Sequence, residues 1–99
     1  MNYKIVFEAS KEIEEAIEYY DLLNKGLGSK LLKELENSLK IICEYPESCV
    51  RISKKFRRCL LRRFPYGIIY TIYNNEIIIT AFMNLYRKPN YWKNRSTEV

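Results

Sequence analysis

Four arginines, Arg57, Arg58, Arg62 and Arg63, lie within seven residues of the sequence. Guanidinium groups match the geometry of phosphate and carboxylate groups. No Asp or Glu occurs between residues 49 and 75, so no acidic residue near in the sequence can neutralise this charge. Exposed ion pairs contribute only about 0–1 kcal/mol to stability. The cluster therefore predicts a surface that binds an external anion, and the alternative is a solvated basic surface without a ligand.

The charge of the chain is distributed unevenly. Residues 1–48 contain six Lys and ten Asp or Glu, a net charge of −4, whereas residues 49–99 carry +9. All the arginines lie in this second half. Such asymmetry favours an anionic partner for one face of the fold, either nucleic acid or an acidic protein segment.

Length and composition predict one soluble domain over residues 1–99. The three cysteines, Cys43, Cys49 and Cys59, have no CxxC spacing and the chain has no histidine, so we expect free thiols and no metal or cofactor. No apolar run approaches the roughly 18 residues of a membrane span, and the first residues do not resemble a secretion signal. We therefore expect a cytoplasmic protein with no membrane contact.

The first half of the chain has the pattern of a strand followed by two helices. Residues 3–7 are β-branched and aromatic, which predicts a strand. Ser10 is an expected N-cap, and apolar residues then recur at helical spacing up to Leu23. Residues 24–28 interrupt the pattern, and a second helical stripe ends before Pro46. So short a link predicts an antiparallel helical hairpin.

The second half has the pattern of antiparallel strands, with a hairpin turn expected at Asn74-Asn75. That register places Ile68 opposite Ala81, and it puts six side chains on a core face: Ile68, Tyr70, Ile72, Ile77, Ile79 and Ala81. Thr71 and Thr80 are expected on the wetter face. Because the helical hairpin can cover one face only, we expect the other face to be partly open.

Three segments of the chain, "EASKEIEEAIEYYD", "LLRRFPYGIIYTIYNNEIIITAF" and "RKPNYWKNR", together resemble the RelE/ParE superfamily of bacterial type II toxins. The resemblance implies an α+β fold: an N-terminal strand, an α-helical hairpin and a C-terminal antiparallel β-meander, with the helices packed on one face of the sheet. RelE-type members cleave mRNA in the ribosome without a metal, and ParE-type members poison DNA gyrase. The resemblance also implies a partner, a cognate antitoxin with an acidic or disordered neutralising segment.

The resemblance implies different residues for the two activities. A ribonuclease of the RelE type would use Arg62, Arg87 and Tyr91 as catalytic residues. Gly67, Asn84 and Leu85, however, stand where ribonuclease relatives carry important arginines and a histidine, so gyrase inhibition is the favoured activity. An inactive toxin-like interaction module is a further alternative. The residues expected to bind the target or the antitoxin are Arg57, Arg58, Arg62, Arg63, Arg87, Lys88 and Trp92. Tyr91 and Trp92 could instead pack as a C-terminal lid.

Overall fold

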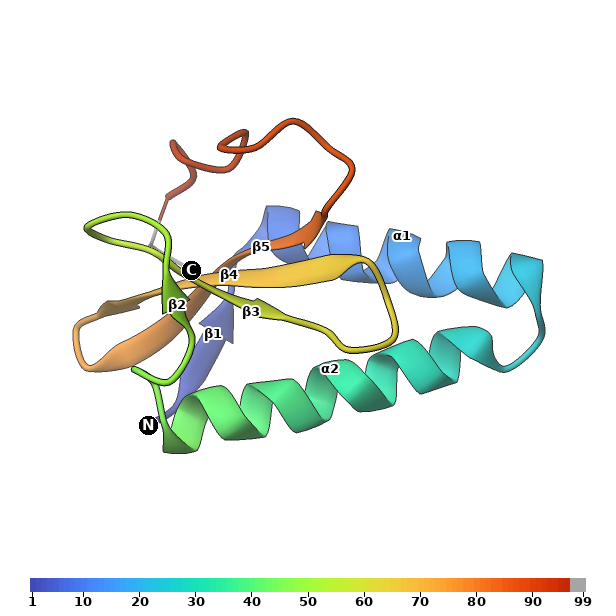
Figure 1. Cartoon of the computed structure of the whole chain (residues 1–99), viewed down its shortest axis with the longest axis horizontal. Coiled ribbons are helices and arrows are strands. Elements are labelled where there is room, and N and C mark those ends of the chain that lie inside the picture. The colour runs from blue at the N-terminus through green and yellow to red at the C-terminus, as the bar shows by residue number, and fades with distance from the viewer. Residues whose placement is uncertain (97–99) are drawn as a thin grey trace.

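The computed structural model describes residues 1–96, which form a five-stranded sheet and two long helices (Figure 1). The first strand, β1 (Tyr3–Ile5), leads into helices α1 (Phe7–Leu23) and α2 (Leu27–Glu44). Four strands follow: β2 (Val50–Arg51), β3 (Arg57–Leu60), β4 (Tyr66–Tyr73) and β5 (Glu76–Asn84). The predicted order of a strand, a helical hairpin and then antiparallel strands is confirmed.

Helix α1 begins four residues earlier than the sequence pattern predicts. The N-cap is Val6 without a side-chain hydrogen bond, and the predicted cap Ser10 lies inside the helix, where its hydroxyl donates to the Phe7 carbonyl at 2.6 Å. The Val6 amide still donates to the Ile79 carbonyl of β5 at 3.1 Å. The chain therefore passes from the sheet into the helix with no connecting loop, and this tertiary contact determines where α1 begins.

The sheet has the order β1-β5-β4-β3-β2. Strands β2 to β5 form the predicted antiparallel meander, and β1 joins its edge in parallel, with Tyr3 opposite Ile77 and Ile5 opposite Ile79. Since β1 pairs only with residues 77–79, the later part of β5 has no strand on that side within the described chain. This stretch of strand edge is available to other elements.

The turn between β4 and β5 is confirmed at Asn74 and Asn75, whose φ angles of 50° and 61° are both left-handed. The predicted register holds from Tyr73 to Tyr70, but the predicted pairing of Ile68 with Ala81 is wrong. A β-bulge between Ile69 and Tyr70 shifts the register, so that Ile69 lies opposite Ala81. Thr80 is the additional residue on β5, and the nearly continuous apolar run of this strand gives no sign of such a bulge in the sequence.

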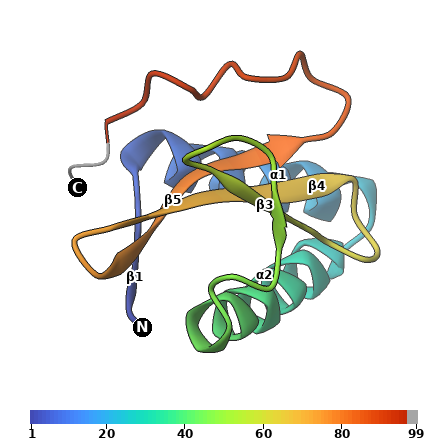
Figure 2. The same cartoon turned by 60° about the vertical axis from the view of Figure 1, so that its left-hand side comes forward.

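Both faces of the sheet are covered. Helices α1 and α2 pack on one face over Ile68, Tyr70 and Ile79, as predicted. On the other face, the C-terminal segment (residues 85–96) crosses the sheet in both views (Figures 1 and 2). A second apolar cluster forms beneath it from Phe56, Ile69, Ala81, Met83 and Trp92. The centre of the face that is expected to be partly open is therefore covered, while Leu60 and Tyr73 on the same face are 51% and 46% exposed.

The predicted distribution of buried and wet side chains also needs correction at three positions. Thr71 and Thr80 are 4% and 1% exposed, whereas Ile72 is 41% exposed. Ile72 lies close to the β4–β5 turn and outside the apolar cluster that the helices cover, and Thr80 is the bulged residue between the fully buried Ile79 and Ala81. Ile79 is fully buried as predicted.

Candidate functional site

The strands β2 and β3 and the link between them carry a concentration of positive charge, which we call the basic hairpin. Its cationic residues are Arg51, Lys54, Lys55, Arg57 and Arg58. The link is a tight turn in which the Ser53 hydroxyl accepts the backbone amide of Phe56 at 3.1 Å. Phe56 is itself buried, with its ring edge-on to Trp92 at 4.8 Å between centroids. The turn that carries Lys54 and Lys55 is therefore held in a fixed position between the two strands.

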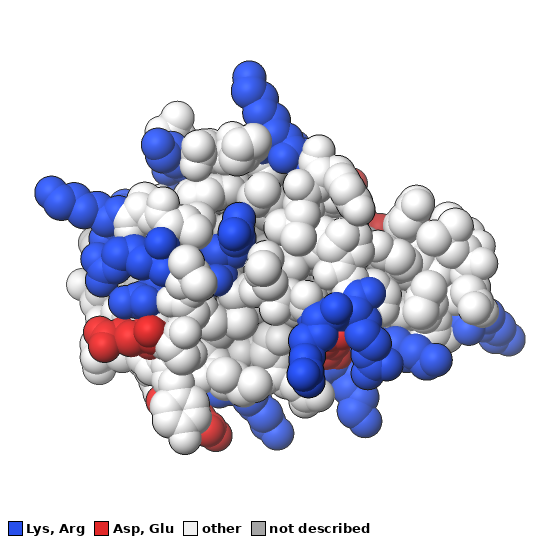
Figure 3. Space-filling model, in the orientation of Figure 1, with Lys and Arg blue, Asp and Glu red and all other residues white. Residues whose placement is uncertain are grey.

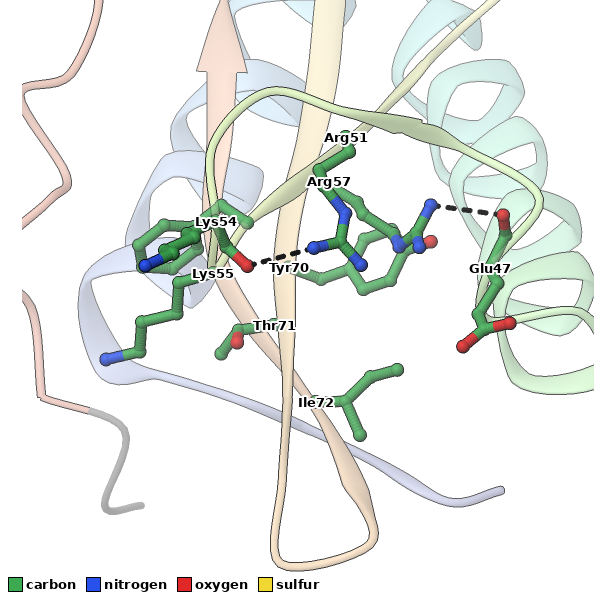
Figure 4. Close-up of a pocket in the computed structure, with 9 residues that line it drawn as sticks. Glu47, Arg51, Lys54, Lys55, Arg57, Tyr70, Thr71 and Ile72 are labelled. Atoms are coloured by element: carbon green, nitrogen blue, oxygen red, sulfur yellow. Dashed lines mark hydrogen bonds between the residues drawn. The ribbon is translucent and has the colours of Figure 1, made fainter.

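A hollow of about 360 Å³ lies between the basic hairpin and β4 (Figure 4). Its lining residues are Glu47, Arg51, Lys54, Lys55, Phe56, Arg57, Tyr70, Thr71 and Ile72. Lys and Arg side chains gather over β2 and β3 on the left of the molecule (Figure 3). With four cations and one carboxylate around a cavity, the electrostatic potential of this hollow favours an anionic group.

The guanidinium groups of the hollow are held by backbone carbonyls. One Nη atom of Arg57 donates to the Glu47 and Cys49 carbonyls at 3.1 and 2.8 Å, and Arg51 donates to the Lys54 carbonyl at 3.3 Å. Within residues 1–96, no carboxylate lies within 4.0 Å of the charged nitrogens of the basic hairpin. The guanidinium groups are thus oriented, but their charge is not neutralised.

Arg58 shows how Gly67 fits into this surface. A Cβ atom at Gly67 would lie 3.0 Å from Cγ and 3.1 Å from Cδ of Arg58, so the glycine leaves room for the arginine stem. The Nε of Arg58 is buried and has no hydrogen-bond partner among the described residues. The stem of Arg58, from the neighbouring strand β3, therefore lies in the space beside Gly67.

A second group of charges holds the C-terminal segment to the rest of the fold, and we call it the C-terminal clasp: Glu12, Arg87, Tyr91 and Arg95. The Glu12 carboxylate of α1 accepts the Tyr91 hydroxyl at 2.6 Å and two Arg95 nitrogens at 2.9 and 3.2 Å. Arg87 approaches the same carboxylate at 3.5 Å, and its guanidinium stacks over the Tyr91 ring at 3.9 Å.

The clasp uses the stretch of β5 edge that β1 leaves unpaired. The Phe82 amide donates to Glu12 at 3.1 Å, and the Thr80 carbonyl accepts Arg95 at 2.9 Å. The side chains of Glu12 and Arg95 are only 11% and 15% exposed. An arginine and a glutamate from opposite ends of the chain therefore satisfy the strand edge and each other.

The surroundings of the clasp raise the pKa of two of its members, Tyr91 and Arg95. Burial and the hydrogen bond to Glu12 raise the pKa of Tyr91 well above its usual value. For Arg95, burial is the largest influence and lowers the pKa, but the hydrogen bond and the charge attraction to Glu12, together with smaller attractions to Tyr91 and Glu8, outweigh it, so the net pKa is raised. Tyr91 is thus a neutral hydrogen-bond donor at neutral pH, and a phenol in that state is a poor proton acceptor.

Arg62 and Arg63 lie in the turn between β3 and β4, which places both outside the strand. Their backbone amides donate to the carboxylate of Glu34 on α2, and the Arg63 side chain lies 3.8 Å from the same group. Both arginine side chains are exposed. They gather with Lys30 and Lys33 around a hollow next to α2, where Figure 3 shows a second group of positive side chains.

The structure brings some of the predicted site residues together and separates others. Arg57 and Arg58 share the basic hairpin, Arg87 and Tyr91 share the clasp, and Arg62 lies with Glu34 on another part of the surface. Lys88 is exposed. Trp92 is 2% exposed, which is the packed arrangement that the lid alternative predicts.

Sequence reasoning missed Glu12, Arg95 and the cations Arg51, Lys54 and Lys55. The three cations were detectable, because they lie in the same acid-free stretch, residues 49–75, as the predicted Arg57 and Arg58. Glu12 lies in a helix start that is rich in glutamate, and nothing in that pattern distinguishes it from its exposed neighbours Glu14 and Glu15.

Asn84 and Leu85, two positions named in the sequence analysis, lie at the end of β5 and just after it. The Asn84 side-chain oxygen accepts the Tyr86 amide at 2.9 Å and so stabilises the turn that leaves β5. Leu85 is 37% exposed.

Among residues 1–96 there is no cluster of three or more potential metal ligands of the Cys, Asp and Glu types. No described helix is long and apolar enough to cross a membrane.

Comparisons with known proteins point to one family. The family described as "ParE toxin of type II toxin-antitoxin system, parDE" matches residues 3–87. The fold is similar to that of a chain in a solved structure entitled "Chromosomal ParDE TA system from P. aeruginosa", with a TM-score of 0.76 and 18% sequence identity. That alignment covers 86% of this chain and 96% of the other. A comparison with the sequences of curated proteins found no match.

Proposed function

Because the chain belongs to the ParE toxin family of type II toxin–antitoxin systems, we propose that it arrests growth by inhibiting DNA gyrase and that a cognate antitoxin neutralises it. The alternative within the wider superfamily is ribosome-dependent cleavage of mRNA. The observation that carries the choice between them is the hydrogen bond from the Tyr91 hydroxyl to Glu12.

That hydrogen bond bears on catalysis because metal-free RNA cleavage needs a group that accepts a proton from the 2′-hydroxyl. Tyr91 is the family-matched candidate, and here its proton is directed at Glu12 and its pKa is raised. Arg87, a second candidate catalytic residue, forms an ion pair with the same carboxylate. The chain also has no histidine to take over the role. These features support a toxin that acts by binding.

The basic hairpin is the surface that we assign to the partner contacts. Its charges are oriented by backbone carbonyls and lack acidic partners among the described residues, so an incoming carboxylate or phosphate meets guanidinium groups that are already in place. Three further predicted residues, Arg62, Arg63 and Lys88, are also exposed. Arg62 and Arg63 add positive charge to the hollow next to α2. An acidic antitoxin segment and the gyrase–DNA complex both have the complementary charge.

The test measures DNA supercoiling and mRNA integrity separately. The protein is expressed without its neighbouring antitoxin, and purified protein is added to DNA gyrase in a supercoiling assay. We expect growth arrest, loss of supercoiling activity and intact mRNA. Replacing Arg51, Lys54 and Lys55 with Gln should weaken gyrase inhibition roughly tenfold or more, because several long-range attractions are lost at once.

The matched control replaces three exposed lysines elsewhere, Lys25, Lys40 and Lys93, with Gln and removes the same total charge. It should inhibit gyrase as the parent protein does. Cleaved mRNA with normal supercoiling would establish the ribonuclease alternative instead. Normal growth, with folded protein present and antitoxin absent, would identify an inactive interaction module.

A further inference from the structure

Two of the three cysteines lie next to the pairing of β2 with β3: Cys59 belongs to β3, and Cys49 directly precedes β2. Val50 pairs with Arg58 and Arg51 with Arg57, so the next pair in this antiparallel register is Cys49 and Cys59. In the other direction along the strands, Ile52 lies opposite Phe56. The Ile52 amide donates to the Phe56 carbonyl at 2.9 Å, so Ile52 and Phe56 form a hydrogen-bonded pair. Hydrogen-bonded and non-hydrogen-bonded pairs alternate, so Cys49 and Cys59 occupy a non-hydrogen-bonded pair, the type with the closer side chains.

Both cysteines are free and half-buried, and both pack against the apolar cluster under the helices. The Cys49 thiol is close enough to Cys59 to contribute to its raised pKa. The Cα atoms of a non-hydrogen-bonded pair lie about 4.5 Å apart, inside the range that a disulfide bond can span. Cys43 belongs to α2 and stands apart from this pair in the sheet.

We infer that Cys49 and Cys59 form a dithiol site that reacts with a small disulfide such as oxidised glutathione and closes an intramolecular disulfide between β2 and β3. One thiolate attacks the glutathione disulfide, forms a mixed disulfide and releases one reduced glutathione. The second cysteine then attacks the protein sulfur of the mixed disulfide and releases the second glutathione. Two protein thiols are oxidised and one glutathione disulfide is reduced to two thiols.

The surroundings assign the two cysteines different parts in this exchange. Cys49 is flanked by the exposed residues Ser48 and Val50, and the Ser48 hydroxyl lies 4.0 Å from its sulfur. Burial and the neighbouring Cys49 thiol raise the pKa of Cys59 to about 12. Cys49 is therefore the sulfur that meets the reagent first, and Cys59 is the one that closes the disulfide, slowly.

The disulfide would act on the basic hairpin directly. Strand β2 is only two residues long, so few ladder hydrogen bonds hold it to β3. The Cys49 carbonyl is also the acceptor for the Arg57 guanidinium at 2.8 Å. A covalent bond between residues 49 and 59 encloses the whole basic hairpin and fixes the anchor of Arg57.

The experiment uses the full-length protein, held in excess oxidised glutathione at mildly alkaline pH until the thiol count is constant, with peptide mapping by mass spectrometry. We expect a Cys49–Cys59 disulfide with the loss of two hydrogen atoms and one remaining thiol at Cys43. The melting temperature should rise on the order of 10 °C, because the closed loop restricts the unfolded chain. A reductant should reverse both changes.

Three variants separate this site from other thiol chemistry. Cys43→Ser should behave as the parent protein does, whereas Cys49→Ser and Cys59→Ser should form only mixed disulfides with glutathione. The inference fails if the parent protein keeps three thiols, if it stops at mixed disulfides at constant thiol count, or if its disulfides join two chains. It also fails if the mapped disulfide includes Cys43. Because the parent protein gives the main result, a variant that folds poorly does not decide the outcome.

Discussion

The C-terminal clasp and the basic hairpin both hold arginines in fixed positions, but with different acceptors. In the clasp, Arg95 donates to the Glu12 carboxylate, and both groups are largely buried. In the basic hairpin, Arg57 donates only to backbone carbonyls, and no carboxylate among residues 1–96 lies within ion-pairing distance. A carboxylate neutralises a guanidinium, whereas a carbonyl only orients it. The clasp should therefore contribute stability and the basic hairpin binding.

The largest expected effect comes from Glu12→Ala. It leaves Arg95 largely buried without a counter-ion and removes the acceptor of the Phe82 amide and the Tyr91 hydroxyl. Removing one partner of a buried ion pair costs about 3–5 kcal/mol, so the free energy of unfolding should fall by that amount in urea titrations.

Glu14→Ala is the matched control for that change. Glu14 lies in the same helix with its side chain 68% exposed, and it pairs only with Lys11. Its removal should change the free energy of unfolding by less than about 0.5 kcal/mol. Equal losses at Glu12 and Glu14 would show that the clasp contributes no more than a surface ion pair does.

Glu34→Ala tests a site between the two extremes. The Glu34 carboxylate accepts the backbone amides of Arg62 and Arg63, and the guanidinium of Arg63 is exposed. Loss of an acceptor for two turn amides should cost about 1–3 kcal/mol, less than at Glu12 because water can reach the turn. Glu36→Ala, two residues further along α2 at an exposed position, should be close to neutral in the same titration.

Tyr91→Phe should reduce the stability by about 1–2 kcal/mol at neutral pH, because the hydrogen bond to the Glu12 carboxylate is lost. The raised pKa of Tyr91 also predicts a pH dependence, since the folded state holds the phenol proton more tightly than the unfolded state does. This contribution is complete below the usual pKa of 10.0 and is lost as the pH rises toward the folded-state value.

As the pH rises above 10, the free energy of unfolding should therefore fall less for Tyr91→Phe than for the parent protein. Tyr73→Phe, at an exposed position beside the β4–β5 turn, is the control and should follow the parent protein. Parallel curves for the parent protein and Tyr91→Phe would remove Tyr91 from the account of the clasp.

The smallest effect on stability is expected in the basic hairpin. The exposed cations Arg51, Lys54 and Lys55 can be replaced together by Gln with a change of less than about 0.5 kcal/mol per site. Binding of the partner should weaken and its dependence on salt should flatten, because three attractive charges are lost. Unfolding of this variant with unchanged binding by the folded fraction would reverse the contrast between the two regions.

The sequence was sufficient for the parts of the fold that depend on local patterns. Apolar spacing predicted both helices, and the two asparagines predicted the turn between β4 and β5. The family resemblance supplied the arrangement of the helices on one face. Arg57 and Arg58 were identified from the sequence itself, because they lie in a stretch without acidic residues.

The remaining features depend on contacts between distant residues. The β-bulge at Thr80 exchanges the faces of the residues before and after it, which made the pairing of Ile68 wrong. Glu12 and Arg95 meet only because β1 ends early and leaves the edge of β5 free. The covering of the second face by Trp92 follows from the path of a segment that has no helical or strand periodicity.

The parallel pairing of β1 with β5 determines when the chain can finish folding during its synthesis. Residues 3–5 leave the ribosome long before their partners at residues 77–79. The helical hairpin depends on near neighbours and can form early, whereas the edge of the sheet must wait for a long loop to close. Arg95, which closes the clasp, follows later still. A nascent chain that stalls before residue 77 therefore carries both helices and the basic hairpin but has no partner for its first strand.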